Sequence, residues 1–479
     1  MKTYHILFLT MVIAITARTH AQALQLIKHQ GHSYASFADA VTAIGSAKET
    51  LIVSSNAVVS TAVNVPSTLH VRVIGSGQFT QSGSGAITFN GPFEAPLRQV
   101  FSGFAAGKIR LGSGAVNEAY PQWWGAKGNG ASDDTSSIQA AIDSCNRVVV
   151  PPGQYKITST LLVNNRMGFR LTGAGIKTTS MVAGTPKMVL FRVRNSMYSS
   201  FSDIFLNGNS IATSTLVLDQ ISPGATYVTN TDTFDRMWFG YAAGTAVVVG
   251  DDNNGQVDNI TFNECIFSNS PTLVQVRGQV TLGIRFNGGS LNYPTIAGFD
   301  LIRGGEVSIS KMHFLGGFKD PAKSCPMLRR AGTFGHVTMT ENEMEGAGTF
   351  LFAPDDTGFA NTWPIELIGN TIGYIGPAGS NVIDYRQRGP LIIIGGDINS
   401  SNPANFIYDP PGNAMLYDVG VRYVRVKVVM GAHGTRSGRK ATGELMAGSP
   451  SGNIVGSGSP VGGTVLTLGM GVADDSSYR

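Results

Sequence analysis

The sequence is poor in cysteine and in charged residues, and both shortages narrow the class of protein. Three cysteines in 479 residues are too few, and odd in number, for a disulfide scaffold, so Cys145, Cys265 and Cys325 are expected to fill an apolar core. Charged residues make up 14% of the chain, with a formal net charge of +4. No basic run typical of nucleic-acid binding is present, so no nucleic-acid partner is expected.

Long hydrophobic runs are also missing, with one short exception at the N-terminus. Ile6 to Ile15 is almost entirely apolar, with Lys2 before it and Ala21-Gln22-Ala23 after it. This run is about half of the roughly 20 residues that a membrane-spanning helix needs. The order of basic, apolar and small residues is typical of a signal peptide. We predict a signal peptide over residues 1–23, no membrane span, and secretion to the periplasm or the extracellular space; an uncleaved anchor is the alternative.

Stretches with helical periodicity are scarce, whereas glycine (60 residues) and β-forming residues are common, which indicates a mostly β protein. One pattern, apolar-x-apolar-x-x-small/apolar-x-apolar, recurs with ends 28, 24, 23, 30, 28 and 26 residues apart. Such a period is typical of the coils of a solenoid. We therefore predict an all-β fold, a single-stranded right-handed parallel β-helix. The repeated segments are 233–239, 261–267, 285–291, 308–314, 338–344, 366–372 and 392–398.

The common register of these segments predicts which side chains stack from coil to coil. Asn342 and Asn370 share an inward position and are expected to begin an asparagine ladder between coils about 4.8 Å apart. One inward column should contain Phe234, Phe262, Phe286, Ile309, Met339, Leu367 and Ile393, and a second should contain Phe239, Phe267, Leu291, Phe314, Met344, Ile372 and Ile398.

The β-helix is predicted to occupy residues 119–420, with other segments on either side. Residues 24–118 form a leading β-rich module, with a helix over Phe37–Ile44 and several short strands separated by turns rich in glycine, serine and proline. Residues 421–479 are expected to form a C-terminal cap followed by a tail rich in glycine and serine.

Residues Tyr120 to Ile157 are expected to form the N-terminal end of the β-helix. Asp134 or Thr135 can cap a helix, and Ser136 with Gln139 fits a capping box. The apolar residues that follow fall at helical spacing on one face. A helix with one apolar face suits a lid over the open end of a β-solenoid, where it blocks pairing of the edge strands.

This segment resembles the head motif of the pectate-lyase superfamily, which includes relatives of glycoside hydrolase family 28 and many phage tailspikes. The motif reads W-G-A-K-G-D-G-x-x-D-D-T-x-x-I-Q-x-A-I, followed by V-x-x-P-P-G-x-Y. It is specific for architecture rather than for a reaction, and Asn129 replaces its usual aspartate. The matching residues are Trp124, Gly125, Ala126, Lys127, Gly128, Gly130, Asp133, Asp134, Thr135, Ile138, Gln139, Ala141, Ile142, Pro151, Pro152, Gly153 and Tyr155.

Outward-facing residues of neighbouring coils supply the first set of candidate site residues. Hydrolysis of a glycosidic bond uses two carboxylates, whereas β-elimination from a uronic acid uses a cation and a base, and this face offers all of these groups. Ordinary cross-strand ion pairing is the alternative interpretation. The predicted catalytic residues are Lys311, His313, Glu341 and Glu343, and the predicted substrate-binding residues are Arg236, Glu264 and Trp238, the last as a stacking face.

A second set consists of aspartates. Asn230-Thr231-Asp232, Asp251-Asp252, Gly335-His336 and Arg425-Val426-Lys427 reproduce the order of the N-T-D, D-D, G-H and R-x-K motifs of family 28 polygalacturonases. However, His336 follows Asp252 by 84 residues, about three coils rather than one, so the complete polygalacturonase site is not expected. Asp232, Asp251 and Asp252 are still predicted catalytic residues. With Asp235 and Asp258 they could supply an acid/base pair, bind Ca²⁺, or simply solvate a loop.

The resemblance implies lyase or hydrolase chemistry on a polysaccharide. We therefore predict a secreted enzyme that cleaves an extracellular, acidic polysaccharide by β-elimination or by glycosidic hydrolysis. Two alternatives stay open. One is a non-catalytic, tailspike-like binding or structural module, assembled as a homotrimer. The other is a uronate C5-epimerase, which shares the step of proton abstraction. The sugar and the metal requirement are not determined by the sequence.

Overall fold

The chain folds into two compact units in a computed structural model, which describes residues 27–29, 32–220, 227–250, 255–316, 325–332, 334–346, 348–355, 361–412, 414–437 and 453–455. One unit contains the described residues up to Asn117 together with Gln122–Gly125, and the other contains Glu118–Pro121 and the residues from Ala126 onward. The predicted signal peptide lies outside the described residues. Among the described helices, none combines the length and the apolar character that a membrane crossing requires.

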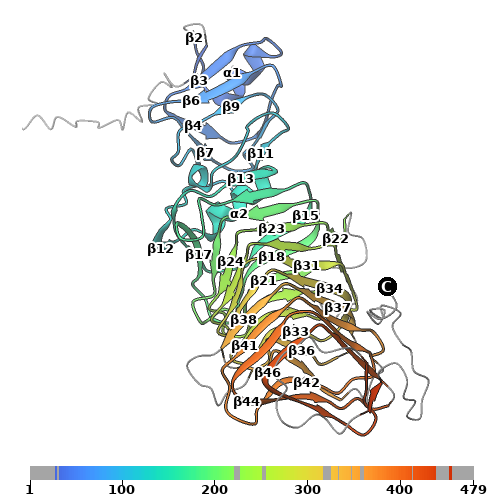
Figure 1. The fold of residues 1–479 in the computed structure, drawn as a ribbon. Helices are drawn as coiled ribbons and strands as arrows, with labels where there is room; N and C mark the ends of the chain where they lie inside the picture. Colours follow the sequence, from blue (N-terminus) through green and yellow to red (C-terminus); the bar gives the residue numbers. More distant parts are fainter. Residues whose placement is uncertain are drawn as a thin grey trace, which may run out of the picture. The chain divides into compact units, whose positions relative to one another are not determined.

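The first unit is a short three-sided β-solenoid closed by helix α1 (Phe37–Ile44), which has the predicted bounds and is capped by the Ser36 side chain. The sequence predicted several short strands here but not their solenoid arrangement, which the structure shows (Figure 1). The strands are β1 (Ile27–His29), β2 (His32–Ser33), β3 (Thr50–Val53), β4 (Asn56–Val59), β5 (Ala62–Val65), β6 (His70–Val73), β7 (Gln78–Gln81), β8 (Ala86–Phe89), β9 (Phe93–Glu94), β10 (Phe101–Ser102) and β11 (Ile109–Leu111).

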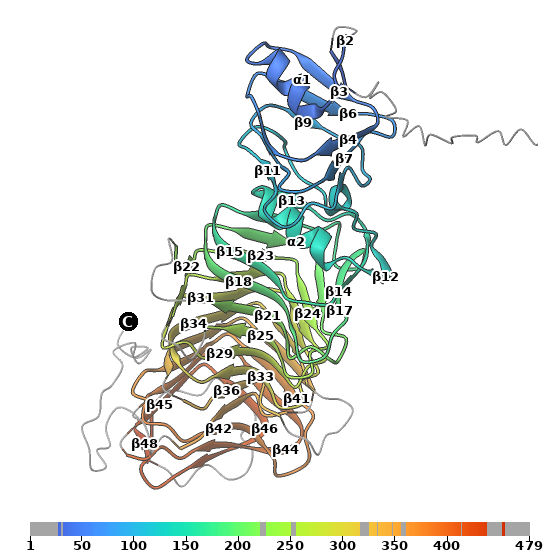
Figure 2. The same ribbon diagram turned by 180° about the vertical axis from the view of Figure 1, so that it is seen from behind.

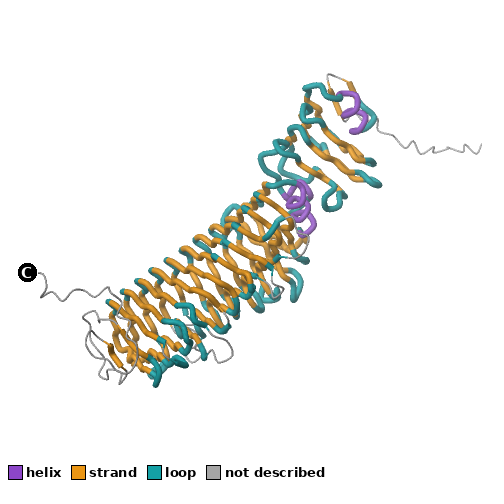
Figure 3. Tube along the Cα trace, turned by 90° about the vertical axis from the view of Figure 1, so that its right-hand side faces the viewer, coloured by secondary structure: helices purple, strands orange, loops and turns teal. Residues whose placement is uncertain are grey.

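The second unit is a parallel β-helix, which confirms the predicted fold class. A typical coil contributes strands to three faces, which we call A, B and C in chain order. Face A is a 13-stranded sheet, and faces B and C are two strand series of a 24-stranded sheet. Successive coils stack along one axis from green to red in Figures 1 and 2, and Figure 3 shows the strands aligned from coil to coil.

The bounds of the strands define the three faces. Face A contains β13 (Arg147–Val149), β16 (Arg170–Thr172), β19 (Ser200–Ser202), β23 (Thr233–Asp235), β27 (Thr261–Asn263), β31 (Ile284–Asn287), β34 (Gly304–Ser310), β37 (Phe334–Thr340), β40 (Ile365–Ile368), β43 (Leu391–Ile394), β45 (Met415–Val419), β47 (Thr435–Ser437) and β48 (Asn453–Val455). Face B contains β12 (Asn129–Asp133), β14 (Gly153–Ile157), β17 (Thr179–Ala183), β20 (Phe205–Asn207), β24 (Trp238–Gly240), β28 (Ile266–Ser268), β32 (Ser290–Asn292), β35 (His313–Leu315), β38 (Glu343–Gly346), β41 (Thr371–Tyr374) and the start of β44 (Asp397–Tyr408). Face C contains β15 (Leu161–Met167), β18 (Val189–Met197), β21 (Ser214–Asp219), β25 (Thr245–Val249), β29 (Thr272–Val276), β33 (Ala297–Leu301), β36 (Leu328–Arg330), β39 (Leu351–Ala353), β42 (Asn381–Tyr385), the end of β44, and most of β46 (Arg422–Met430). Three short strands, β22 (Thr229–Asn230), β26 (Gln256–Asp258) and β30 (Val280–Leu282), lie between faces C and A.

Both predicted inward columns are confirmed by the strand register. Phe234, Phe262 and Phe286 are direct partners on face A, with ring centroids 4.9 Å apart at each step. Phe239 and Phe267 pair in the same way on face B, with centroids 5.4 Å apart. All five rings are buried. Burying each such side chain stabilises the fold by roughly 1.5–3 kcal/mol, and a slip of one residue would turn these rings to the surface.

The asparagine ladder is also confirmed. Asn342 Nδ2 donates to Asn370 Oδ1 at 2.9 Å and to the Ile309 carbonyl at 3.0 Å. Asn342 Oδ1 accepts the backbone N–H of Met312 at 3.0 Å, and the Asn370 amide donates to the Met339 carbonyl at 2.9 Å. The ladder therefore satisfies buried backbone groups at the bend between faces A and B.

The bend between faces A and B places a left-handed residue in each of these coils. The bend turns the chain sharply between two strands, so only a positive φ fits there, and glycine adopts it without strain. Five charged side chains, with φ between 49° and 61°, and three glycines, with φ between 62° and 66°, occupy this position: Asp203, Arg236, Glu264, Lys311, Glu341, Gly288, Gly369 and Gly395. We call this position the A–B corner.

Helix α2 (Thr135–Ser144) closes the end of the second unit and packs against β13, β14 and β15. Asp134 is its N-cap by position, but its carboxylate accepts the N–H groups of Lys127 and Gly128 at 2.7 and 3.0 Å rather than a helix N–H. The predicted capping box is wrong, because the Gln139 amide bonds to the backbone of Leu162 on β15. Two residues of the head motif, Asp134 and Gln139, thus connect helix α2 to neighbouring segments of the second unit.

The coil stack continues past residue 420, where we expected the β-helix to end. Strand β46 pairs in parallel with β44, and β47 pairs in parallel with β45. Arg436 is buried, donates to Asp418 and lies over the Tyr423 ring, whose hydroxyl also donates to Asp418 at 2.9 Å. The buried ion pair with Asp418 allows the charged Arg436 to lie inside a further coil.

Candidate functional site

The predicted catalytic residues of face B lie on neighbouring coils. His313 on β35 is the direct strand partner of Glu343 on β38. Lys311 and Glu341 occupy the A–B corner of the same two coils, with 3.7 Å between Nζ and Oε2. His313 Nε2 also lies 3.9 Å from an Oε2 atom of Glu345, a carboxylate that the sequence analysis did not consider. These residues can therefore contact one ligand together.

Solvent exposure limits what these charges contribute to the fold. The Lys311 and Glu341 side chains are 73% and 61% exposed, and ion pairs this exposed contribute about 0–1 kcal/mol. The cluster is thus free of a strong structural role. The catalytic role of Lys311, His313, Glu341 and Glu343 stays a prediction.

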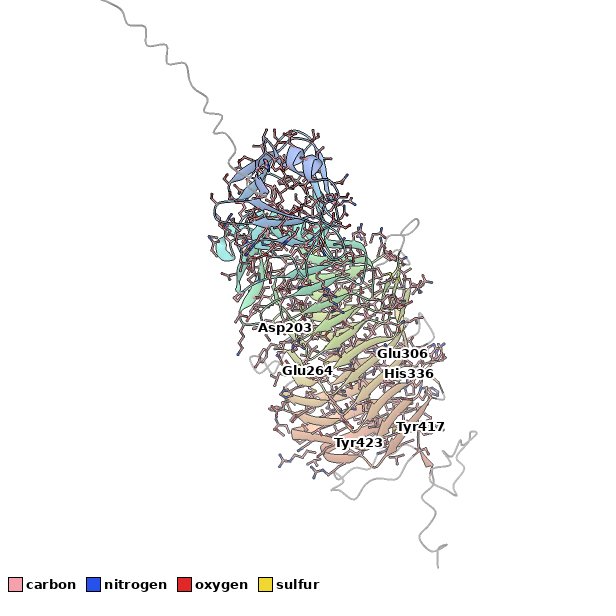
Figure 4. The ribbon with its side chains drawn as sticks, turned by 90° about the horizontal axis from the view of Figure 1, so that it is seen from above. Asp203, Glu264, Glu306, His336, Tyr417 and Tyr423 are labelled. Atoms are coloured by element: carbon pink, nitrogen blue, oxygen red, sulfur yellow. The ribbon has the colours of Figure 1, made fainter. Side chains whose placement is uncertain are left out.

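Two predicted substrate-binding residues at the A–B corner have neighbours that fix their positions. Arg236 donates to both oxygens of Asp203, at 2.8 and 2.7 Å, and this contact lowers the pKa of Asp203. The Glu264 carboxylate lies over Gly288 of the next coil, where an added Cβ would come within 2.2 Å of Oε1. Glycine at this position therefore makes room for the carboxylate. Figure 4 shows Asp203 and Glu264 on the same side of the β-helix.

Trp238, the third predicted substrate-binding residue, is part of an aromatic cluster. Its ring stacks on Phe205 of the preceding coil, with centroids 4.1 Å apart and planes 16° apart. Its Nε1–H donates to Ser268 Oγ at 2.8 Å, which fixes the orientation of the indole. Tyr241 packs against both rings, with centroids 6.2 and 6.4 Å away. Trp238 is partly exposed, so one part of the indole stays available to a ligand.

Asp232 does not lie on the surface, where the sequence suggested it, and its catalytic role stays a prediction. Its side chain is fully buried, and Oδ1 accepts the N–H of Ser199 at 2.8 Å. Burial raises the pKa of Asp232 to about 7. Asp258, which the sequence grouped with Asp232, is buried as well and accepts the N–H of Leu282 at 3.0 Å. Strand alternation alone does not separate inward from outward residues at a bend.

The predicted calcium site was assigned partly to residues that the structure does not describe. Asp251 and Asp252 lie outside the described residues, so their catalytic and calcium-binding roles stay predictions. Within the described part of the chain, no group of three His, Cys, Asp or Glu side chains is arranged to hold a metal ion.

His336 lies on face A, several coils from Asp232. It is the strand partner of Glu306, and its Nε2 lies 3.4 Å from Oε2 of Glu366. Figure 4 shows Glu306 and His336 together, on the opposite side from Asp203. Strand β23 directly follows Asp232, and strand β37 contains His336. Four successive strand pairings separate these two strands, which is roughly 19 Å along the axis. This separation agrees with rejecting a polygalacturonase site.

Face C contains a charged surface whose residues were not among the predicted site residues. Its outward residues form one column in strand register, Arg192, Val217, Val248, Gln275, Asp300 and Arg329. Arg194 and Asp219 pair two residues further along, and Arg277 follows Gln275 by the same step. We call Arg192, Arg194, Asp219, Gln275, Arg277, Asp300 and Arg329 the arginine–aspartate face.

Both aspartates of this face are held by arginine. Arg194 donates to the two oxygens of Asp219 at 2.7 and 2.8 Å, and Arg192 donates to the same carboxylate. Arg329 binds Asp300 in the same bidentate way, at 2.7 and 2.8 Å. Asp219 and Asp300 are only 2% and 1% exposed although they point outward. Bidentate charge-assisted bonds of this kind fix the arginines in place.

Arg277 differs from the other arginines of the face. Its Nη1 donates to Gln275 Oε1 at 3.5 Å, a long contact, and the Gln275 amide in turn donates to Asp300 at 3.1 Å. The buried Nε of Arg277 has no hydrogen-bond partner among the described residues. A buried donor without a partner costs free energy, so Arg277 is held less completely than the other arginines of the face.

A cavity of about 470 Å³ lies where face C meets helix α2. Two of its lining residues are strand partners of the arginine–aspartate face, Leu162 with Arg192 and Asn164 with Arg194. Burial raises the pKa of Asp143 and lowers the pKa of Arg166, which also line it. The cavity therefore marks the N-terminal end of the charged face.

Alternation within short apolar runs was the signal that could have revealed this face. Several of its strands place a charged residue within or directly after an apolar run, as in residues 190–194, 216–219, 274–277 and 299–301. The recurring pattern used above covers only faces A and B, so it gave no register for face C.

The parallel β-helix and a family match that spans the head motif confirm the predicted resemblance to pectate-lyase-like β-helices. Residues 123–294 match the family model described as rhamnogalacturonase A/epimerase, pectate lyase-like. The chain is 30% identical over 201 residues to mannuronan C5-epimerase AlgE3 of Azotobacter vinelandii. That match covers 38% of this chain and 11% of the relative.

Two solved structures are similar to most of the chain at low sequence identity. The Dettilon tailspike protein is 12% identical with a TM-score of 0.47, covering 71% of this chain and 68% of the tailspike. The A-module of mannuronan C-5 epimerase AlgE6 of Azotobacter vinelandii is 15% identical with a TM-score of 0.46, covering 70% of this chain and 97% of the module.

Proposed function

We propose that this protein binds an acidic polysaccharide along the arginine–aspartate face and cleaves it outside the cell. The observation that carries the proposal is the charge of that face, where four arginines accompany two aspartates. Both carboxylates are already neutralised by arginine, so the face keeps a net positive charge. Arg277 is the arginine best placed to receive a carboxylate of the ligand.

The ligand is proposed to be a polymer because the face repeats along the axis. Strands of a β-sheet recur about every 4.8 Å, so equivalent positions follow one another in a straight row suited to an extended chain. The names of the similar proteins support sugars that carry carboxylates, since mannuronan is a polymer of uronic acid. Charge and shape thus favour the same class of ligand.

Uronate epimerisation is a second candidate reaction, favoured by the 30% identity with a mannuronan C5-epimerase. Epimerisation and β-elimination both begin when a base removes the C5 proton of a uronic acid. Hydrolysis instead requires an acid and a base on either side of the glycosidic bond. The same binding face could therefore serve different reactions, and the products distinguish them.

Binding is tested with the Arg277→Gln variant. We expect wild-type protein to be retarded by polygalacturonate, polymannuronate or rhamnogalacturonan in affinity electrophoresis, but not by neutral dextran. Arg277→Gln should weaken this binding about tenfold or more, because a charged hydrogen bond contributes about 1.5–3 kcal/mol. Arg422→Gln is the matched control, since Arg422 pairs with Asp397 on face B and is exposed. Equal losses in the two variants would count against the proposal.

The reaction is assigned from the products of the bound polymer. Elimination leaves an unsaturated uronate that absorbs ultraviolet light, hydrolysis yields new reducing ends without that absorbance, and epimerisation exchanges the C5 proton with deuterated water without shortening the chain. Retained binding without any of these products would leave a binding module and refute the proposed cleavage.

A further inference from the structure

The corner between faces B and C carries two exposed tyrosines in a strained conformation. Tyr241 and Tyr293 have φ of 57° and are 36% and 41% exposed. They occupy equivalent positions two coils apart, because Gly240, Ser268 and Asn292 are successive strand partners and each is followed by a corner residue. The residue in the intervening coil is Asn269, with φ of 52°. We call this position the B–C corner.

The choice of tyrosine at the B–C corner is costly for folding. Glycine adopts a left-handed backbone most easily and asparagine is the next best, whereas a residue with a bulky side chain is strained there. An exposed ring also gains little from burial. Strain of this kind persists where another requirement selects the residue, and ligand-binding surfaces are a common place for it.

The surroundings of the two rings suit a sugar. Tyr241 packs against Trp238 and Phe205, so its ring is held before any ligand arrives. Hydroxyl and amide groups lie between the two tyrosines, and Asn269 Nδ2 donates to Ser268 Oγ at 3.0 Å. Rigid aromatic rings offer apolar contact at low entropic cost, and the polar groups between them can bond to hydroxyls.

We propose that Tyr241 and Tyr293 form a stacking platform for the pyranose rings of a polysaccharide that runs along the β-helix axis. The tyrosines are two strand spacings apart, roughly 10 Å, so they contact alternate rings rather than neighbouring ones. Each corner residue leads into a strand of face C, β25 or β33, so the platform borders the arginine–aspartate face. The inference rests on the proposed function and adds a contact that recognises the sugar ring instead of its charge.

The test uses Tyr241→Asn, Tyr293→Asn and the double variant, because asparagine adopts the left-handed conformation more easily than tyrosine. Tyr198→Asn is the matched control: Tyr198 has φ of 55° and is 56% exposed, but lies between β18 and β19 at a different corner. We expect equal or higher thermal midpoints for Tyr293→Asn and Tyr198→Asn. The double variant should bind the acidic polymer about tenfold more weakly, and Tyr198→Asn should bind it like wild type.

Salt separates this platform from the charged face. The loss caused by the double tyrosine variant should persist at high ionic strength, whereas the loss caused by Arg277→Gln should shrink as charges are screened. Tyr241→Phe with Tyr293→Phe should keep wild-type affinity, since the rings remain. If wild type and the double asparagine variant bind the acidic polymer equally well, the stacking platform is refuted while the proposed function stands. If wild type binds no polysaccharide at all, the proposed function fails and the platform fails with it.

Discussion

Carboxylates occur in two kinds of buried environment in this molecule, and the difference decides what each can do. Asp219 and Asp300 point outward from face C and accept hydrogen bonds from arginines, which fixes the positions of those arginines. Asp232 lies inside the coil and accepts the N–H of Ser199 instead. The loss of water around Asp232 raises its pKa to about 7. Asp232 therefore keeps its proton in the folded protein up to about pH 7, well above the usual range of an aspartate.

Asp232→Asn is predicted to change the pH dependence of stability. Between about pH 4 and pH 7 the folded protein keeps a proton on Asp232 that the unfolded chain has released, so stability falls as pH rises, by up to about 1.4 kcal/mol per unit. Asparagine can keep the bond from Ser199 and does not titrate. The variant should therefore lose this slope and be about 1–4 kcal/mol more stable than wild type at pH 8. Chemical denaturation at several pH values measures this.

The same variant separates a structural role of Asp232 from a catalytic one. A structural role predicts that Asp232→Asn keeps polymer turnover at neutral pH. A stability profile parallel to that of wild type would contradict the raised pKa. Loss of all turnover in a well-folded variant would support the predicted catalytic role of Asp232 instead.

At the scale of a structural element, the asparagine ladder shows how one bend is stabilised. Asn342 is buried and serves three backbone or amide groups on neighbouring coils: the Met312 N–H, the Ile309 carbonyl and the Asn370 amide. The interior around Asn342 is apolar and offers no water as a substitute. Without the Asn342 side chain, these groups would therefore lose their hydrogen bonds to it. The ladder therefore fixes how these coils stack at the A–B corner.

Asn342→Ala is predicted to destabilise the β-helix by about 2–4 kcal/mol, because it leaves the Met312 N–H and the Ile309 carbonyl buried without partners. Asn399→Ala is the control, since Asn399 is exposed on β44 and should change stability by less than about 0.5 kcal/mol. Urea denaturation of both variants measures the difference. Similar values for the two variants would mean that the ladder bonds add little.

At the scale of the whole β-helix, we expect the binding of an acidic polymer to depend on how many coils of the arginine–aspartate face contact it. Arg192 and Arg329 are joined by five strand pairings, a distance of roughly 24 Å along the axis. This exceeds the screening length of about 8 Å at physiological ionic strength, so the arginines act as separate contacts rather than one charge. A ligand must be long to reach all of them.

Affinity for acidic oligosaccharides is therefore predicted to rise with chain length until the ligand spans about 24 Å, and then to level off. Calorimetric titration with a size-graded series of oligouronates measures this dependence. A neutral series of the same lengths is the control. Affinity that is already maximal for a disaccharide would show that one coil, rather than the row, binds the ligand.

The sequence by itself determined the coil and its register. The spacing of phenylalanine, isoleucine and methionine at 23–30 residues fixed the inward columns, because only that register buries every large apolar side chain. Asn342 and Asn370 were recognisable for the same reason, since they interrupt a column that is otherwise apolar or small. The head motif likewise indicated the pectate-lyase-like class from its residues alone.

Only the tertiary structure decided which charged residues share a surface. Lys311 and Glu341 could be placed together because they lie in the repeating pattern, whereas Arg277 and Asp300 lie on face C, whose position in the coil depends on connections of varying length. Asp232 looked like a surface acid but turns inward at a bend. Periodicity determines which residues stack, because burial repeats with each coil; the connections and bends decide which surface a polar residue reaches, because their lengths do not repeat.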